Sequence, residues 1–273
     1  MALSGSGNRG QLRRGGSDRS VPFPEMPGRG TVMNIVIGLL ISGLARGETV
    51  AEAFPPPVGA TRATSSDFGR YLAQLELRAP DVPVRTHAGG VVGHHARVVD
   101  LPLVKGDLQQ CADSAIRLHA EWQRSEGKPD ISYHATSGDP IPWSRYQAGE
   151  RPYVSNNHIA WRSIGTPGSW DNWLRSVFMW AGTRSLQAYE TVPVSQPMPG
   201  DVLVEGGSPG HAVLILDVAT RGDETWLLIG EGFMPAQDFH VELGPEAGWW
   251  LWTEQGLGLP HWWMDSDSLR RWR

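Results

Sequence analysis

Cysteine is almost absent from the chain: Cys111 is the only one in 273 residues. A single thiol cannot form a disulfide within the chain, so Cys111 is either free or joined to another molecule. The metal-binding spacings HxH, HExxH and CxxC are absent as well. His94 and His95 are adjacent, but neighbouring residues on a strand point to opposite faces. We therefore expect no metal site and no cofactor.

An excess of basic charge is also missing. The chain has 24 Lys and Arg against 29 Asp and Glu, a net charge of -5, and its arginines are scattered. A surface without a basic field does not attract polyanions, so nucleic acid is not an expected partner. Tryptophan, in contrast, is abundant: there are 13 Trp against 5 Tyr and 6 Phe, concentrated from Trp170 onward. Packing in a core accounts for most such residues, although exposed indoles could stack on sugars or peptides.

The amino-terminal residues do not resemble part of a packed domain. Residues 1–30 are rich in Gly, Ser, Arg and Pro without apolar periodicity, which predicts disorder. The apolar run at 32–45 is short for a bilayer span and precedes the small-x-small sequence AEA at 51–53. This layout predicts a signal peptide over 31–53, an exported protein of the periplasm or extracellular space, and no stable membrane span. A packed helix is the alternative for the apolar run.

The remainder is expected to contain a proline-rich linker at 54–64 and a single domain at 65–273. Periodicity and turn residues predict, in order, a helix at 108–124, a strand at 131–138, an irregular stretch at 139–168 and a helix at 171–182. The last third consists of apolar runs of strand length separated by turns. Helices early and antiparallel strands late predict an α+β fold.

The helix that carries Cys111 begins in the sequence DLQQCADSAIRLHAEW, residues 107–122. Asp107 is a suitable N-cap and Gln110 would complete a capping box, which places Cys111 at the end of the first turn. The unpaired N–H groups and the helix dipole favour a thiolate there. Asp113 could pair with Arg117 four residues later. Alternatively, Cys111 belongs to an apolar stripe and is simply a small buried side chain.

A histidine opens the first strand of a predicted β-hairpin. The apolar runs HAVLILDVA and TWLLIGEGF are joined by the polar turn TRGDE. A turn centred near Gly222 places His211 opposite Phe233, with Glu231 two residues back on the same face and diagonally within reach of the imidazole. A register slip of one residue would send Glu231 to the other face and leave Gln237 as the candidate. His211 could also be a turn histidine bonded to the backbone.

Together these segments supply the parts of a thiol active site. Cys111 would be the nucleophile, His211 the base, and Glu231 or Gln237 the group that orients the imidazole. The backbone N–H of Cys111 and the side-chain amide of Gln110 or Gln109 could stabilise an oxyanion. The predicted chemistry is hydrolysis of an amide or ester.

This layout resembles the papain-like fold of bacterial NlpC-type cell-wall peptidases and related amidases. In that fold a cysteine begins a helix packed on a sheet, and a histidine begins a strand after a GD-led strand. The matching pieces here are Gly200-Asp201 and the strand of His211. The resemblance implies an α+β domain with a papain-like core, in which the helix bearing Cys111 packs on an antiparallel sheet. It also implies peptidoglycan, or another envelope peptide or amide, as the substrate.

The sequence is similar over residues 65–270 to a bacterial family of exported proteins that is described only as a domain of unknown function. The motifs that carry this similarity are DLQQCAD at 107–113, AGTRSL at 181–186, GDV and PGHAV within 200–213, and MPAQ at 234–237. The similarity implies no established activity. It also suggests that Gln often occupies the position of Glu231 in the family.

Two functions of different classes follow. The first is an exported thiol hydrolase that acts on cell-wall peptides, with acyl transfer on the same Cys–His pair as a variant. The second is a non-catalytic envelope module that binds glycan or peptide in a groove lined by the tryptophans of the carboxyl-terminal third. Binding that survives Cys111→Ala without release of soluble fragments would favour the second.

Overall fold

The computed structural model describes residues 47–273. The expected leader at 1–30 and most of the expected signal peptide lie outside the described residues. Within them, Val50–Ala53 form helix α1, whose first residue, Val50, is buried. Thr49 caps this helix, because its hydroxyl accepts a hydrogen bond from the backbone N–H of Glu52. The end of the segment expected to be cleaved therefore packs as part of the domain.

The stretch expected to be a linker, 54–64, also belongs to the domain. Phe54 is buried in the core, and Thr61–Arg62 form strand β1, which pairs with strand β11 (His211–Arg221). Arg62 forms an ion pair with Asp217 of β11 and donates to the carbonyl groups of Ala51 and Phe54. The prolines at 55–57 make the backbone irregular, but the anchors on both sides hold the segment against the sheet.

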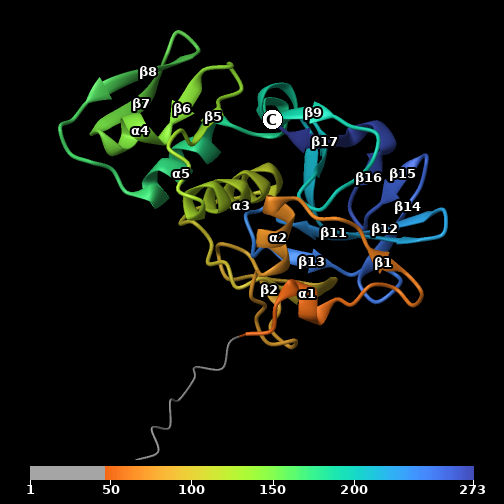
Figure 1. Ribbon diagram of the computed structural model, residues 1–273. Coiled ribbons are helices and arrows are strands. Elements are labelled where there is room, and N and C mark those ends of the chain that lie inside the picture. Colours follow the sequence, from red (N-terminus) through yellow and green to blue (C-terminus); the bar gives the residue numbers. More distant parts are fainter. Residues whose placement is uncertain (1–46) are drawn as a thin grey trace, which may run out of the picture. The chain divides into compact units, whose positions relative to one another are not determined.

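The centre of the domain is one antiparallel sheet (Figure 1). Its strand order is β4-β13-β12-β11-β10-β17-β9, with β1 pairing β11 and β14 pairing β12. Apart from β1 and β11, the strands are β4 (His95–Val98), β9 (Thr191–Pro193), β10 (Val202–Glu205), β12 (Glu224–Glu231), β13 (His240–Glu242), β14 (Trp249–Trp252) and β17 (Leu269–Trp272). The expected α+β class is confirmed.

Smaller elements surround this sheet. The helices are α2 (Asp67–Ala73), α3 (Cys111–Ser125), α4 (Trp143–Gln147), α5 (Trp170–Trp180), α6 (Thr183–Ser185), the π-helical turn Leu186–Glu190 and the 3₁₀ turn Ser266–Ser268. Four two-stranded ribbons complete the domain: β2 (Val84–Arg85) with β3 (Val91–Val92), β5 (Ser132–His134) with β6 (Pro140–Pro142), β7 (Glu150–Ser155) with β8 (His158–Ser163), and β15 (Gly256–Gly258) with β16 (Trp263–Asp265).

Both faces of the sheet are covered by apolar side chains. Ala212, Leu214 and Leu216 of β11 pack in the larger cluster, together with the apolar face of α3. The alternate residues Val213 and Ile215 point the other way, because successive side chains on a strand lie on opposite faces. They pack in a second cluster that also contains Leu203, Leu227, Ile229, Leu257, Met264 and Leu269. The strands are therefore apolar on both sides, as the runs HAVLILDVA and TWLLIGEGF indicate.

Helix α3 begins later than the capping pattern predicts. Asp107 is not the N-cap, because its Oδ1 accepts a hydrogen bond from the backbone N–H of Ala236, at 2.7 Å. Gln110 is the N-cap instead, and its N–H donates to Oδ2 of Asp113 at 3.1 Å. Cys111 is thus the first helical residue rather than the end of the first turn.

The expected ion pair between Asp113 and Arg117 does not form. Nη1 of Arg117 donates to Oε1 of Gln109 at 2.6 Å and to the carbonyl oxygen of Pro102, and its guanidinium lies near Glu121. Asp113 faces the backbone at the helix start instead. The i,i+4 spacing predicts a pair with Asp113, but it gives no sign that Gln109, just before the helix, binds the guanidinium of Arg117 instead.

The stretch expected to be irregular, 139–168, contains regular structure. β7 and β8 form a hairpin whose turn residues, Asn156 and Asn157, have φ angles of 50° and 63°. Asparagine tolerates this left-handed conformation, and two such residues form the turn that suits a two-residue hairpin. The prediction of an irregular stretch is therefore wrong. The Asn156-Asn157 pair was the sequence feature that indicated a hairpin turn.

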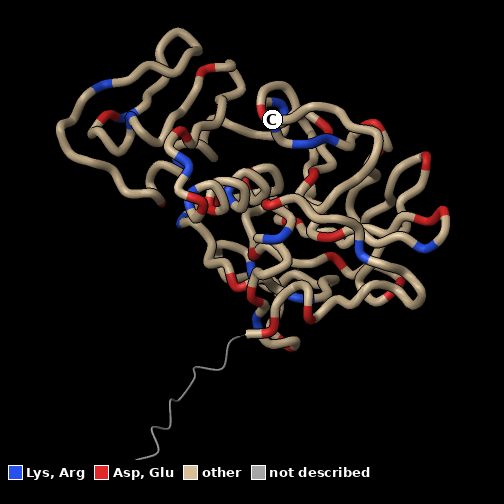
Figure 2. The backbone as a smooth tube through the Cα atoms, viewed as in Figure 1, with Lys and Arg blue, Asp and Glu red and all other residues tan. Residues whose placement is uncertain are grey.

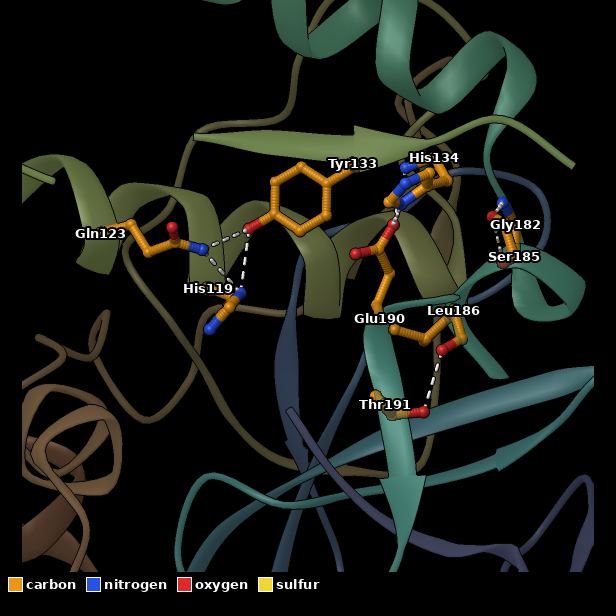
Figure 3. Close-up of polar contacts among 9 residues, drawn as sticks. All are labelled: His119, Gln123, Tyr133, His134, Gly182, Ser185, Leu186, Glu190 and Thr191. Carbon is orange, nitrogen blue, oxygen red and sulfur yellow. Dashed lines mark hydrogen bonds and ion pairs between the residues drawn. The ribbon is translucent and has the colours of Figure 1, made fainter. Parts of the chain in front are cut away.

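Buried polar contacts join α3 to the chain that follows it (Figure 3). Nδ1 of His119 lies 3.0 Å from both the hydroxyl of Tyr133 and the side-chain nitrogen of Gln123. Next to Tyr133, the backbone N–H and Nδ1 of His134 contact Oε1 of Glu190 at 2.6 and 3.0 Å. These contacts tie β5 to the centre of α3 and to the segment that leads into β9.

Charges of both signs are interspersed along the described part of the chain (Figure 2). Basic residues mark no single element in this view. Among residues 47–273, no helix combines the length and the apolar character that crossing a membrane requires.

Candidate functional site

A β-bulge in the β11–β12 hairpin brings the candidate histidine and glutamate together. Next to the turn, Arg221 pairs with Glu224, whereas beyond the bulge at Leu216 the register shifts and Leu214 pairs with Gly230. The alternation of faces also inverts at the bulge, since Val218 packs with Val213 and Ile215. Continued to the end of the hairpin, this register places His211 opposite Phe233, with Glu231 on the same face.

The His211 side chain is held on several sides. Its Nε2 lies 3.0 Å from Oε2 of Glu231, and the two side chains are 2% and 3% exposed. Phe233 and Trp262 flank the ring at centroid distances of 5.3 and 5.5 Å. Trp262 is itself fixed, because its indole N–H donates to Oε2 of Glu205, the residue that pairs with His211 on β10.

Nδ1 of His211 is left without a partner. It makes no hydrogen bond with a described residue, and it is not among the fully buried polar atoms that lack one. The ring itself is almost completely covered. An imidazole with Nε2–H donated to a carboxyl group has its lone pair on Nδ1, which is the form that accepts a proton.

Two further buried residues lie beside Glu231. His240 pairs directly with Glu231 across β12 and β13, and Glu242 follows two residues later on the same face. Nε2 of His240 lies 2.9 Å from Oε1 of Glu242 and 4.0 Å from Oε1 of Glu231. Neither residue was predicted from the sequence, although H-x-E at 240–242 within a strand would place two polar side chains on one face.

Burial and mutual contact set the protonation of this group. Burial, reinforced by the neighbouring Glu242, raises the pKa of Glu231 to about 9, so Glu231 keeps its proton at neutral pH. Burial opposes charge on His240, but the hydrogen bond and charge of Glu242 outweigh it and raise the pKa of His240. The contacts of Glu242 with His240 and Glu231 likewise outweigh its own burial and lower its pKa. His211 therefore faces an uncharged carboxyl group.

Cys111 lines a cavity of about 270 Å³ at the amino-terminal end of α3. The thiol is free and its residue is partly exposed. Polar residues form much of the wall: Asp107, Gln110, Asp113, Thr183 and Ser208, together with the Gly207–Gly210 loop that immediately precedes His211. The cavity thus lies between the start of α3 and the segment that leads into β11.

Cys111 and His211 approach this region from different sides of the sheet. α3 covers the face of Ala212 and Leu214, whereas His211 shares its face with Val213 and Ile215. No hydrogen bond joins the thiol to the imidazole among the described residues. What links the two is the Gly210 backbone, which lines the cavity of Cys111 and is bonded directly to His211.

The other candidates occupy different places. Gln110 lines the cavity, and its side-chain nitrogen lies 3.4 Å from Oδ1 of Asp107. Gln109 is fully buried, and its Oε1 accepts from Arg117 and from the backbone N–H of Val104. Gln237 is buried in an isolated bridge with Thr86, and no hydrogen bond connects it to His211 within residues 47–273. Glu231 is therefore the residue that contacts the imidazole.

Tryptophan is not part of the cavity wall. Of the carboxyl-terminal indoles, Trp249 is fully buried and Trp262 packs beside His211, whereas Trp263 is exposed and Trp272 lines a different pocket. The cavity beside Cys111 is therefore not the tryptophan-lined groove that was expected. Trp262 instead covers the contact between His211 and Glu231.

Fold and site define an α+β protein with an antiparallel sheet, a buried His–Glu pair at one end of its central hairpin and a free cysteine in an adjoining cavity. The family model described as a domain of unknown function (4846) matches residues 50–271, and the chain belongs to this family. No curated protein and no solved structure matches the chain.

Proposed function

We propose that the protein is an exported thiol hydrolase with a papain-like active site that acts on amide bonds of cell-wall peptides. The observation that carries the proposal is the state of His211. Its Nε2 is bound to Glu231, and its Nδ1 makes no hydrogen bond within residues 47–273; the residue lies next to Gly210 in the wall of the cavity that Cys111 lines. A fixed imidazole with an available lone pair is what activation of a thiol requires.

In the reaction, Nδ1 of His211 removes the proton from Cys111, and Sγ attacks the carbonyl carbon of the substrate. The backbone N–H groups at the start of α3 and the amide of Gln110 stabilise the oxyanion. The C–N bond breaks as His211 returns the proton to the leaving amine. Water then attacks the thioester with His211 as base, which releases the acid and restores the thiol.

Approach of Cys111 to His211 is part of this proposal. Catalytic hydrogen bonds are often long or absent in the free enzyme and form once substrate is bound. A substrate in the cavity would fill the space between α3 and the Gly207–Gly210 loop, which lies next to both residues. Its exclusion of water would favour contact between the thiol and the imidazole.

The protonated Glu231 has a defined role here. A carboxyl group that keeps its proton presents His211 with a neutral oxygen acceptor, as the side-chain amide of Gln does. With Nε2–H of His211 as the donor, this oxygen holds the ring in place. The chemistry of the site is thus the same with Glu or Gln at this position, and the proposal predicts that Glu231→Gln retains activity.

Alkylation of the full chain tests the proposal. Iodoacetamide should modify Cys111 in the native state, and His211→Ala should slow the reaction by ~10-fold, because the base that generates thiolate is gone. His158→Ala on the β7–β8 hairpin is the matched control and should react like the wild type. Modification that requires denaturant, or equal rates in wild type and His211→Ala, would overturn the proposal.

A second assay addresses the substrate. Purified peptidoglycan should release soluble peptides with the wild type and with Glu231→Gln, and release none with Cys111→Ala. The absence of a thiol–imidazole hydrogen bond among residues 47–273 favours one rival, a module that binds envelope peptide or glycan without cleaving it. Retention of Cys111→Ala on peptidoglycan, with no fragments released by the wild type, would establish that rival.

A further inference from the structure

On the far side of Glu231 from His211, three buried side chains converge. Ligand atoms of Glu231, His240 and Glu242 lie within 4.8 Å of one another, and each residue is at most 3% exposed. We propose that these three residues bind a divalent transition-metal ion, with Zn²⁺ the best fit. The inferred site shares Glu231 with the proposed thiol site, but it is argued from the donor geometry alone and does not require the thiol chemistry.

Strand pairing creates the site. Glu231 lies at the end of β12 directly opposite His240 of β13, and Glu242 lies two residues further along β13 on the same face. Side chains on paired strands are held to the spacing of the backbone ladder, so the three donors are positioned before any ion arrives. A preformed donor set lowers the conformational cost of binding.

The spacing of the donors suits zinc. Nε2 of His240 lies 2.9 Å from Oε1 of Glu242 and 4.0 Å from Oε1 of Glu231. Tetrahedral coordination with bonds of about 2.0–2.1 Å requires ligand atoms roughly 3.3 Å apart. These two separations bracket this value, and all three ligand atoms lie within 4.8 Å of one another, so adjustments of up to about 1.5 Å bring the three donors into place.

The outer contacts are those of metal ligands. Nδ1 of His240 donates to the backbone carbonyl of Asp238 at 2.9 Å, which turns Nε2 toward the two carboxyl groups. Oε2 of Glu231 accepts from Nε2 of His211, which leaves Oε1 to face His240. Metal-bound histidines commonly donate the second ring nitrogen to a carbonyl, and ligating carboxylates are commonly hydrogen-bonded on their free oxygen.

A buried oxygen of Glu242 is available to a cation. Oε2 of Glu242 is fully buried and receives no N–H or hydroxyl hydrogen among the described residues. Burying a carboxylate oxygen without a positive partner is costly, so either a proton held on Glu231 or a metal ion must lie beside it. Binding of a divalent ion would displace the proton of Glu231 and the proton on Nε2 of His240. Two ionised carboxylates and one neutral imidazole around the ion then have zero net charge, which suits a site closed to water.

Direct binding tests the inference on the full chain. After chelator treatment and dialysis, Zn²⁺ titrated into the protein should bind with a stoichiometry of one, and Co²⁺ should give the visible absorption typical of four-coordinate sites with nitrogen and oxygen ligands. Glu242→Gln preserves volume and should weaken Zn²⁺ binding by ~100-fold, because a charged ligand is lost. Cys111→Ser should bind like the wild type, which excludes the thiol as a ligand.

Glu254→Gln, at an exposed carboxylate distant in sequence from the three donors, is the control and should also bind like the wild type. No Zn²⁺ binding by the folded wild type, or equal affinity in the wild type and Glu242→Gln, would overturn the inference and leave the cluster as carboxyl groups joined by shared protons. His240→Gln offers an independent check if Glu242→Gln fails to fold. Loss of peptidoglycan cleavage in any of these variants would not bear on metal binding, so the two proposals fail separately.

Discussion

Oε2 of Glu231 lies 3.0 Å from Nε2 of His211, although the turn of their hairpin would set the two side chains on opposite faces. Register counted from the Arg221–Glu224 pair places His211 opposite Met234. The extra residue at Leu216 shifts the register by one and returns Glu231 to the face of His211. The contact between His211 and Glu231 therefore depends on the bulge.

Replacing Glu231 should distinguish the contribution of its hydrogen bond to stability from that of its packing. Glu231→Leu removes the acceptor of the His211 N–H and should lower the free energy of unfolding by ~1–3 kcal/mol. Glu231→Gln keeps an oxygen acceptor and should stay within ~1 kcal/mol of the wild type. Urea unfolding with chelator present measures both. Equal losses in the two variants would show that the contact contributes nothing beyond packing.

The start of α3 should be sensitive to any side chain at position 232. A Cβ on Gly232 would overlap the hydroxyl of Ser114 and approach the carbonyl oxygen of Gln110 at 3.3 Å. Gly232→Ala should therefore displace the first turn of α3, lower stability by ~1–3 kcal/mol and change the iodoacetamide reactivity of Cys111. At Gly93, an added Cβ meets nothing within 4 Å, so Gly93→Ala is the control.

An unchanged Gly232→Ala variant would contradict the close packing of this residue against α3. Thermal unfolding provides the stability readout and mass spectrometry of the alkylated protein the reactivity readout. If Gly93→Ala showed the same loss of stability and the same change in Cys111 reactivity, the cause would be a general effect of replacing glycine in a loop rather than the contact with Ser114.

Asp113 should make the protein less stable as pH rises above the acid range. Burial raises the pKa of this carboxyl group to about 8, while the unfolded chain has the ordinary value near 3.8. Between these values the folded state binds more protons than the unfolded state, so stability falls as pH increases from about 4 to 8. The slope attributable to this group is at most ~1.4 kcal/mol per pH unit.

Asp113→Asn removes that titration, and its free energy of unfolding should vary less with pH over the same range. The measurement is a series of urea unfolding curves at several pH values with wild type and variant in parallel. Identical slopes for the two proteins would mean that the carboxyl group is not held in its acid form.

His119 should make the protein less stable as the pH falls into the acid range. Burial lowers the pKa of His119 to about 3, and the ring accepts hydrogen bonds from Tyr133 and Gln123 (Figure 3). Between pH ~6.5 and ~3 the unfolded chain binds the extra proton, so stability present above pH ~6.5 is lost as pH falls.

Substitution of His119 tests this acid sensitivity. His119→Gln keeps an acceptor for Tyr133 but cannot titrate, so its stability should fall less steeply over pH 6 to 4. Circular dichroism during acid unfolding follows the change, and His158→Gln at an exposed site should behave like the wild type. A variant that is as acid-sensitive as the wild type would place the responsible protonation elsewhere.

Local patterns predicted the central elements and failed where distant residues decide the structure. The strands of the hairpin follow from two apolar runs and a polar turn, and the helix of Cys111 follows from its periodicity. The start of that helix was predicted wrongly, because Asp107 accepts a hydrogen bond from Ala236, 129 residues later, and does not cap the helix. Nothing in the sequence between Asp107 and Cys111 reveals this partner.

The contact between His211 and Glu231 was predicted from a turn centred on Gly222. The observed turn pairs Arg221 with Glu224, which shifts the register by one residue from the predicted one. The bulge at Leu216 compensates for that difference. The strand lacks the glycine that often marks a bulge, and the only local irregularity is Asp217, the polar residue that directly follows Leu216 in the run HAVLILDVA. His240 and Glu242 were missed because their relation to Glu231 depends on the return of β13 to the edge of β12.

The same bulge divides the hairpin into two separately anchored parts. The half next to the turn is held by β1 on one side and β14 on the other, whereas the half that carries His211 and Glu231 is held by β10 and β13. Lengthening the loop at Gly222-Asp223 changes only the first half. This tip is thus a natural insertion point for a reporter or an affinity tag, and a graft there would leave the distant ring and its carboxyl partner undisturbed.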